Sequence, residues 1–217
     1  MSYPIGYSGS MNYTILPNNF DDLRKILEQN EQPVLLLEGS RQVADDDADR
    51  LKQLGSFLAR EFPQAIFRSG NADGSDTLFA RGVEDIDPTR MQVVTPHVGH
   101  RKKNIHPSSY TFPLSESSSV HEAELASYSN EATPKNRNLI EKRHQVPRLK
   151  AKANYLLRDT LKVIGDPEKG LAPATIGLFY TKPDPMAGGT GHTIRVCLNQ
   201  NVPVFLQEQW FQWLEVK

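Results

Sequence analysis

Cysteine is nearly absent from this chain of 217 residues, which contains only Cys197. A lone cysteine excludes a disulfide within the chain and any zinc site built from several cysteines. The sequence also lacks a run of about 18 apolar residues, so we expect no transmembrane helix. Its first residues do not place an apolar stretch after a basic start, as a secretory signal would. These absences lead us to expect a cytoplasmic protein that has no membrane partner.

Excess charge of one sign is also missing, because the net charge is only −1. The charge is nevertheless uneven: residues 96–150 hold 9 Lys and Arg against 5 Asp and Glu, whereas residues 1–95 hold 9 against 15. The middle of the chain is therefore electropositive and suited to attract an anion. A general DNA-binding domain would carry a basic face throughout, so nucleic acid is a less favoured partner than a small anion.

The hydrophobic pattern alternates between strands and helices. Helices are expected at 20–29, 46–61, 75–81 and 147–164, followed by one that ends near 200 and a short closing helix. Strands are expected at 34–37, 65–67, 91–95, 175–180 and 202–206, the first of them continuously apolar and hence covered on both faces. This alternation predicts an α/β, Rossmann-like fold with a mostly parallel five-stranded sheet and helices on both faces.

Two segments depart from this pattern. Residues 1–18 predict an irregular arm with Tyr3, Tyr7 and Tyr13, either a loosely packed terminus or a brace in a homo-oligomer. Residues 97–146 predict a polar insertion between strands three and four, with a short helix near 120–128. The rest of 19–217 is expected to form a single domain. The apolar stripe of 147–164 is expected to face the core.

Three loops rich in small residues follow strands one, two and four, at Gly39–Arg41, Ser69–Asp76 and Gly188–Thr193. The carboxyl ends of parallel strands meet at one edge of a sheet, which is where ligands bind. Glycine lets backbone amides approach a ligand closely, and a following helix adds its positive dipole end. Each loop alone could be an ordinary turn. Together they predict a site for a phosphate-bearing, nucleotide-like ligand.

The order of these motifs resembles the SLOG superfamily, which unites the DprA/SMF DNA-processing proteins and the LOG cytokinin-activating enzymes. The resemblance rests on Leu37–Arg41, Arg68–Asp76, the pair Arg137-Asn138 and Gly188–Thr193. It is closest to the small YspA-like branch, although Lys135 and Asn136 separate Pro134 from Arg137 here. The resemblance implies a Rossmann-like fold that binds nucleotides or nucleotide-derived ligands, or nucleic acid in the DprA branch.

Chemistry and the resemblance together predict the ligand-binding residues Gly39, Ser40, Arg41, Ser69, Gly70, Asn71, Ala72, Gly74, Ser75, Asp76, Arg137, Asn138, Gly188, Gly189, Thr190, Gly191, His192 and Thr193. Structural alternatives stay open for several of them. Arg41 could pair with the acidic run 45–47, Ser75 and Asp76 could simply begin a helix, and Arg137 could be a surface arginine. His192 could pack within its loop instead of acting on a ligand.

The catalytic residues are unknown from the sequence; the candidates are Asp76, Asp73 and His192. In the LOG signature PGGxGTxxE a glutamate acts on the glycosidic bond, and Arg195 stands at that position here. A guanidinium cannot replace a carboxylate in acid–base catalysis, so the LOG phosphoribohydrolase reaction is disfavoured. We therefore predict a nucleotide sensor or binding protein. The alternatives are a hydrolase acting on the N-glycosidic or phosphate bond of a nucleotide and a DprA-like binder of single-stranded DNA.

A metal site is not expected. The pattern His97-x-x-His100-x5-His106 has no acidic partner nearby, and a true site needs three or four ligands of defined geometry. No cofactor is indicated beyond the nucleotide-like ligand.

Overall fold

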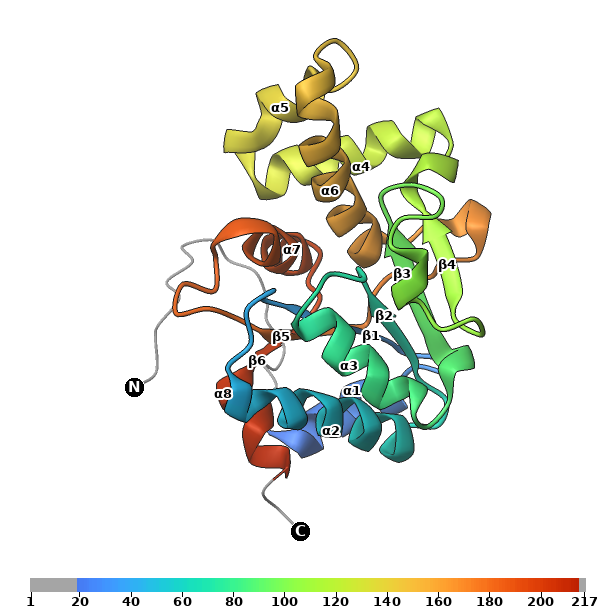
Figure 1. The fold of residues 1–217 in the computed structure, drawn as a ribbon, viewed down its shortest axis with the longest axis vertical. Helices are drawn as coiled ribbons and strands as arrows, with labels where there is room; N and C mark the ends of the chain where they lie inside the picture. Colours follow the sequence, from blue (N-terminus) through green and yellow to red (C-terminus); the bar gives the residue numbers. More distant parts are fainter. Residues whose placement is uncertain (1–18, 215–217) are drawn as a thin grey trace.

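The computed structural model describes residues 19–214, and its strands form one six-stranded sheet. The strands are β1 (Val34–Gly39), β2 (Ile66–Ser69), β3 (Met91–Thr95), β4 (Tyr110–Pro113), β5 (Ile176–Tyr180) and β6 (Val204–Leu206). All neighbours pair in parallel, in the order β4-β3-β2-β1-β5-β6 (Figure 1). The α/β, Rossmann-like prediction is confirmed, but the expected number of five strands is wrong.

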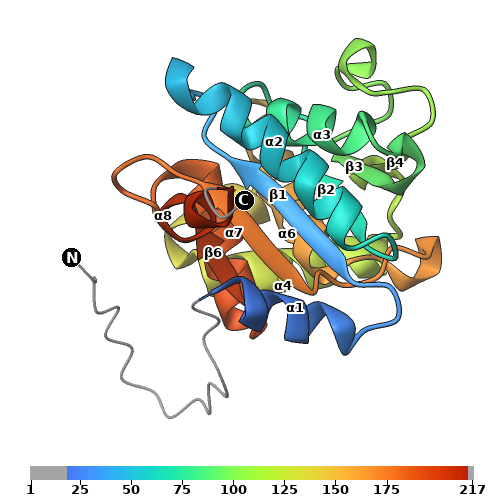
Figure 2. The same ribbon diagram turned by 90° about the horizontal axis from the view of Figure 1, so that it is seen from below.

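One face of the sheet is covered by α1 (Phe20–Glu28), α2 (Asp45–Glu61), α3 (Ser75–Glu84) and α8 (Gln207–Trp210). Figure 2 shows α2 and α3 lying side by side on this face. Glycine allows their close approach, because a Cβ built on Gly55 would lie 2.3 Å from the carbonyl oxygen of Phe79. The aromatic rings of Phe79 and Trp210 meet edge to face in the same core.

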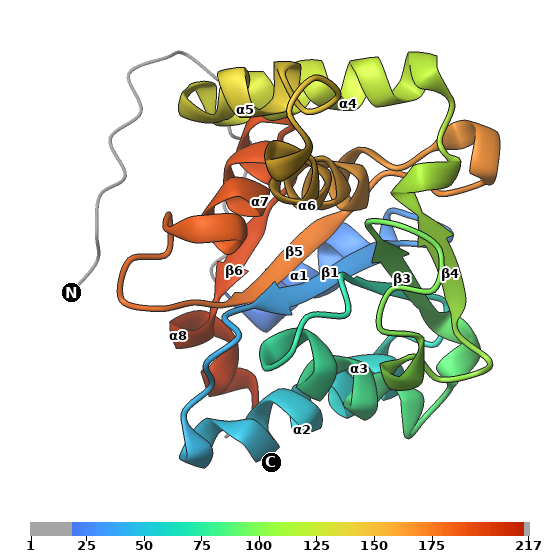
Figure 3. The same cartoon turned by 45° about the horizontal axis from the view of Figure 1, so that its top comes forward.

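The opposite face is covered by two layers of helices (Figure 3). The inner layer consists of α6 (Pro147–Ile164) and α7 (Gly188–Asn199), and the outer layer of α4 (Ser119–Ala132) and α5 (Arg137–Glu141). Leu125 and Ile140 of the outer helices pack with Leu157 and Leu161 of α6. Apolar side chains on α6 thus face both the sheet and the outer layer.

The structure corrects two boundaries. The segment 97–146 adds a strand to the sheet, because β4 pairs with β3 between Gln92–Thr95 and Tyr110–Pro113. It also supplies α4, which is longer than the helix expected near 120–128. Gly188–Thr193 is the first half of α7 rather than a loop; packing of its buried residues on the sheet outweighs the low helix propensity of glycine. The predicted arm at 1–18 lies outside the described residues.

Side chains of β1 alternate between the two faces, as strand geometry requires. Leu35 and Leu37 enter the core beside α1–α3, whereas Leu36 faces the α6 and α7 side. Glu38 points to the same face of the sheet as Leu36 and therefore lies beneath α6. Among the described residues, no helix has the length and apolarity needed to cross a membrane.

Candidate functional site

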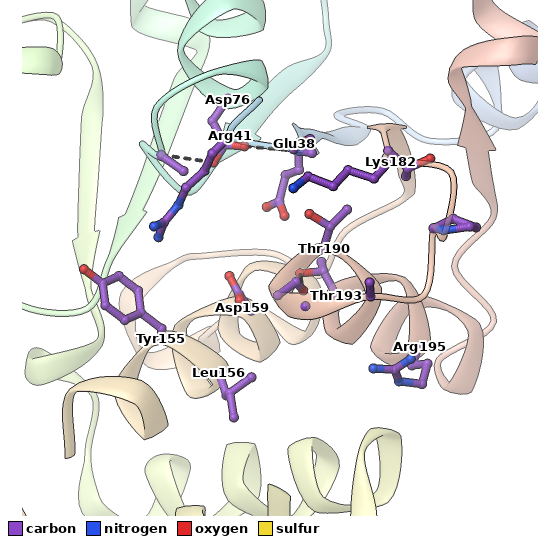
Figure 4. Close-up of a pocket in the computed structure, with 18 of the residues that line it drawn as sticks. Glu38, Arg41, Asp76, Tyr155, Leu156, Asp159, Lys182, Thr190, Thr193 and Arg195 are labelled. Atoms are coloured by element: carbon purple, nitrogen blue, oxygen red, sulfur yellow. Dashed lines mark hydrogen bonds between the residues drawn. The ribbon is translucent and has the colours of Figure 1, made fainter. Parts of the chain in front are cut away.

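A pocket of about 590 Å³ lies at the carboxyl ends of β1 and β5. The strand order reverses between these two neighbours, because β2 to β4 extend in one direction and β5 and β6 in the other. Such a reversal leaves a crevice where open parallel sheets bind their ligands. Figure 4 shows side chains from the loop after β1, from α6 and from the start of α7 around this pocket.

Half of the predicted ligand residues line the pocket: Gly39, Ser40, Arg41, Ala72, Asp76, Gly188, Gly189, Thr190 and Thr193. The other half do not: Ser69, Gly70, Asn71, Gly74, Ser75, Arg137, Asn138, Gly191 and His192. The structure therefore brings the first loop together with the start of α7. Most of the second loop, Ser69–Asp76, lies outside the pocket lining.

Asp76 joins the first two loops. Its Oδ1 accepts a hydrogen bond from the amide of Gly39 at 3.2 Å, and its Oδ2 accepts bonds from the amides of Gly70 and Ala72, both at 3.2 Å. Ser75 adds a bond from its hydroxyl to the carbonyl of Ser40 at 2.7 Å. These bonds occupy the carboxylate and hydroxyl groups, so both side chains position the loops.

Tight packing explains why Gly70 and Gly191 are glycines. A Cβ on Gly70 would lie 1.5 Å from Nη1 of Arg158, and one on Gly191 would lie 2.1 Å from the carbonyl oxygen of Met186. Gly188 differs, because it has a φ of +63° and a Cβ there would meet nothing within 4 Å. The backbone at Gly188 is thus open to a ligand, whereas the other two glycines serve the fold.

The amino end of α7 opens directly onto the pocket. Gly188, Gly189 and Thr190 are its first three residues, and the amides of a first helical turn have no partner within the helix. Within residues 19–214, no side chain caps this end. Uncapped amides together with the helix dipole favour an anion here.

His192 lies on the far side of α7 from the pocket and is fully buried. Its Nδ1 is 2.8 Å from the hydroxyl of Thr133, and its Nε2 is 3.2 Å from that of Ser129 and 3.1 Å from that of Thr160. Burial lowers its pKa. The imidazole therefore holds α7 against α4 and α6, and it cannot reach a ligand in the pocket.

The other predicted polar residues also lie apart from the pocket. Asp73 points outward and pairs with Arg101 at 3.0 Å. Arg137 and Asn138 are exposed at the start of α5, whereas Lys135 and Asn136 just before them line the pocket. Arg195 lines it too, and its guanidinium donates to the carbonyl of Met186 at 2.9 Å.

A buried charged cluster forms the base of the pocket, and sequence reasoning missed it. Nζ of Lys162 lies 2.5 Å from Oε1 of Glu38 and 2.8 Å from Oδ1 of Asp159. Arg158 lies 3.4 Å from the same Asp159 oxygen through its Nε and donates to the carbonyl of Gly70 at 2.8 Å. All four charged side chains line the pocket although each is at most 8% exposed.

The two carboxyl groups of this cluster have opposite pKa shifts. Burial, the largest cause, raises the pKa of Glu38 to about 7, although Lys162 opposes this shift. Burial would also raise the pKa of Asp159, but the charges of Arg158 and Lys162 outweigh it, and the pKa is lowered. Near neutral pH, Glu38 is therefore partly protonated and partly ionised, whereas Asp159 is ionised.

A signal for this cluster was present in the sequence. Tyr155, Arg158, Asp159 and Lys162 follow one another at helical spacing of three, one and three residues, so they share a face of α6. They interrupt the apolar stripe from which the sequence predicts that the helix faces the core. Glu38 directly follows an apolar strand, at the sheet edge where ligands bind.

Exposed cations surround the mouth of the pocket: Arg41, Lys135, Lys152 and Lys182. No group of three or more His, Cys, Asp or Glu side chains that could hold a metal ion occurs in the described part of the chain. The pocket thus combines a cationic rim, an open helix end and a buried charged base.

No family model matches the chain, and no curated protein matches it. Two solved structures are similar in fold. DNA processing protein A from Helicobacter pylori, described for its single-stranded DNA binding mode, has 12% identity and a TM-score of 0.44 over 84% of this chain and 67% of that protein. DprA from Streptococcus pneumoniae has 12% identity and a TM-score of 0.42 over 84% of this chain, which spans about half (51%) of that protein. Similarity at this level carries no argument about the site.

Proposed function

We propose that this protein binds a nucleotide or nucleotide-derived ligand as a sensor or binding protein, with the phosphate at the amino end of α7. The observation that carries the proposal is the uncapped start of a 12-residue helix, at Gly188, in the wall of a pocket of about 590 Å³. A pocket of that volume is in the range that accommodates small-molecule ligands. The order of the sequence motifs supports SLOG-type membership and the YspA-like branch as part of the same proposal.

The charges of the pocket agree with a phosphate ligand. Lys182 stands exposed at its rim, where it can move towards an anion without losing an internal partner among residues 19–214. Lys162 and Arg158, by contrast, are already held by Glu38 and Asp159. We infer that Lys182 and the helix amides bind the phosphate and that the buried cluster contacts the rest of the ligand.

Native mass spectrometry of gently purified protein tests the proposal, because it reports a retained nucleotide and the number of subunits together. A thermal-shift screen should show larger stabilisation by nucleoside phosphates than by the matching nucleosides. Lys182→Ala should weaken nucleotide binding by up to about five-fold, the range of an exposed ion pair. Lys142→Ala, a change at an exposed lysine outside the pocket, is its control. If no phosphate-bearing compound is retained or stabilises the protein, the proposal fails.

A second candidate function is hydrolysis of the N-glycosidic bond of the bound nucleotide. It is favoured by the carboxyl groups of Glu38 and Asp159, which both contact Lys162. Their pKa values shift in opposite directions, so one group can act as an acid while the other stabilises positive charge. Glu38 would donate its proton to the leaving base, which takes the electrons of the broken C1′–N bond. Water would then add to C1′ and return a proton to Glu38, while Asp159 stabilises the positive charge at C1′.

Product analysis separates this candidate from binding without turnover. Release of free base and sugar phosphate by the wild type, lost in Glu38→Gln and in Asp159→Asn while both variants still bind the nucleotide, would support hydrolysis. An unchanged nucleotide after long incubation would exclude it. Single-stranded DNA binding is tested by a gel-shift assay at several salt concentrations, since phosphate contacts make affinity fall steeply with salt.

A further inference from the structure

The pocket has two chemically different ends. In Figure 4, Glu38 and Asp159 form the middle of the pocket; Tyr155 lies on one side of them, and Lys182 extends towards Glu38 from the other side. The amino end of α7 and Lys182 belong to the end that suits an anion. At the other end is Tyr155, the one aromatic side chain in the lining among residues 19–214.

The ring of Tyr155 is held in place by two neighbouring side chains. His100 meets it edge to face with the ring centroids 5.8 Å apart, and the guanidinium carbon of Arg158 lies 5.6 Å from its centroid. His100 in turn contacts His97, with their centroids 5.1 Å apart. A ring fixed in this way loses little side-chain freedom when a flat ligand stacks on it.

Arg41 projects towards the Tyr155 end of the pocket in Figure 4. Its side chain is exposed, and no hydrogen bond or ion pair joins it to another side chain in the described part of the chain. A guanidinium is planar and weakly hydrated, so it stacks on aromatic rings and donates to ring nitrogen and carbonyl acceptors. This end of the pocket therefore presents two planar groups.

The electrostatics of this end favour a neutral ring with acceptor atoms. Burial, followed by the charges of His97, Arg101, Arg158 and Arg41, lowers the pKa of His100. His100 thus behaves as a neutral ring surrounded by arginines. A cationic ligand would be repelled there, whereas a nucleobase offers both a π face and acceptors.

We infer that Tyr155 and Arg41 form a nucleobase subsite, with the base stacked between them and the phosphate at the start of α7. The inference rests on the proposed function and adds the direction in which the nucleotide lies. The sugar of a nucleotide in this orientation spans the centre of the pocket, beside Glu38 and Asp159. The affinity contributed by the base should therefore depend on Tyr155 and Arg41.

Isothermal titration calorimetry with adenosine 5′-monophosphate, guanosine 5′-monophosphate and ribose 5-phosphate tests the subsite. The wild type should bind at least one of the two nucleotides about ten-fold or more tightly than ribose 5-phosphate, which is the range of base stacking on an aromatic side chain. Tyr155→Leu should remove this advantage and leave the affinity for ribose 5-phosphate unchanged. Tyr155→Phe should keep it, because the ring remains, and Arg41→Lys should reduce it, because the charge remains but the planar group is lost.

Tyr128→Leu is the matched control, because Tyr128 is a partly exposed tyrosine of α4 outside the pocket. It should leave every affinity unchanged. Equal wild-type affinity for the nucleotides and ribose 5-phosphate would overturn the subsite while the phosphate site stands. An equal loss for all three ligands in a folded Tyr155→Leu variant would overturn it as well. If none of the three binds, the proposed function fails and the subsite with it.

Discussion

Replacement of Lys162 by methionine tests whether the buried charged cluster is organised as its distances indicate. The ammonium lies 2.5 Å from Glu38 and 2.8 Å from Asp159, and all three side chains are at most 8% exposed. Methionine retains most of the volume but leaves two buried carboxyl groups without this cation. Removal of one partner from a buried ion pair costs about 3–5 kcal/mol.

The cost should depend on pH. Glu38 can avoid a buried charge by keeping its proton, which it does readily below its pKa of about 7. Asp159 retains Arg158 at 3.4 Å. We therefore expect Lys162→Met to lower the free energy of unfolding by about 3–5 kcal/mol at pH 8 and by clearly less at pH 5. For a chain of this size the loss at pH 8 corresponds to a decrease in Tm of about 6–20 °C.

Urea denaturation followed by tryptophan fluorescence measures this loss, because Trp210 and Trp213 are both buried. Lys152→Met is the control: it changes an exposed lysine of the same helix and should cost less than about 0.5 kcal/mol. A loss below about 1 kcal/mol at pH 8, or one that is equal at the two pH values, would refute the reasoning.

Three further predictions concern single side chains. Burial raises the pKa of Glu38 from 4.5 to about 7, so the stability contributed by its neutral form is complete below pH 4.5 and is lost as pH rises through 7. The loss between pH 5 and pH 8 should be about 2.5 kcal/mol, and urea titrations at these two pH values should show that Glu38→Gln removes it. Asp76→Ala leaves three amides without their acceptor and should cost about 3 kcal/mol or more by thermal denaturation; a loss below 1 kcal/mol contradicts its positioning role. His192→Leu leaves three buried hydroxyl groups without the imidazole and should lower the free energy of unfolding by about 2–4 kcal/mol. Calorimetry should show an unchanged nucleotide affinity; a loss of affinity in a folded variant would show that His192 takes part in ligand binding.

The order of helices and strands was predictable because each element repeats its apolar residues at its own period. β3 lies at Met91–Thr95 as expected, and β1 begins at Val34 as expected. β4 could not be predicted in this way. Its residues Tyr110–Pro113 are half exposed at the edge of the sheet, so they lack both the alternation and the continuous apolar run by which strands are recognised.

The start of α7 was missed for a different reason. Gly188, Gly189 and Gly191 have low helix propensity, so the local pattern favours a loop. The helix forms there because its following turns bury Ile194, Val196 and Cys197 against the sheet. Tertiary packing therefore determines where this helix begins, and with it which amides open onto the pocket.

The α/β alternation follows from the amino-acid sequence, because the periods of apolar residues and the turn chemistry of glycine are local properties. The edge of the sheet at which the small-residue loops gather follows from that alternation. Which polar side chains from separate segments meet in the pocket depends on tertiary packing. Glu38 and Lys162 lie 124 positions apart in the numbering, and only the packing of α6 over β1 brings the carboxylate of Glu38 to 2.5 Å from the ammonium of Lys162. In the same way, the docking of α7 turns His192 into the core. The docking of α3 brings Asp76 to three backbone amides.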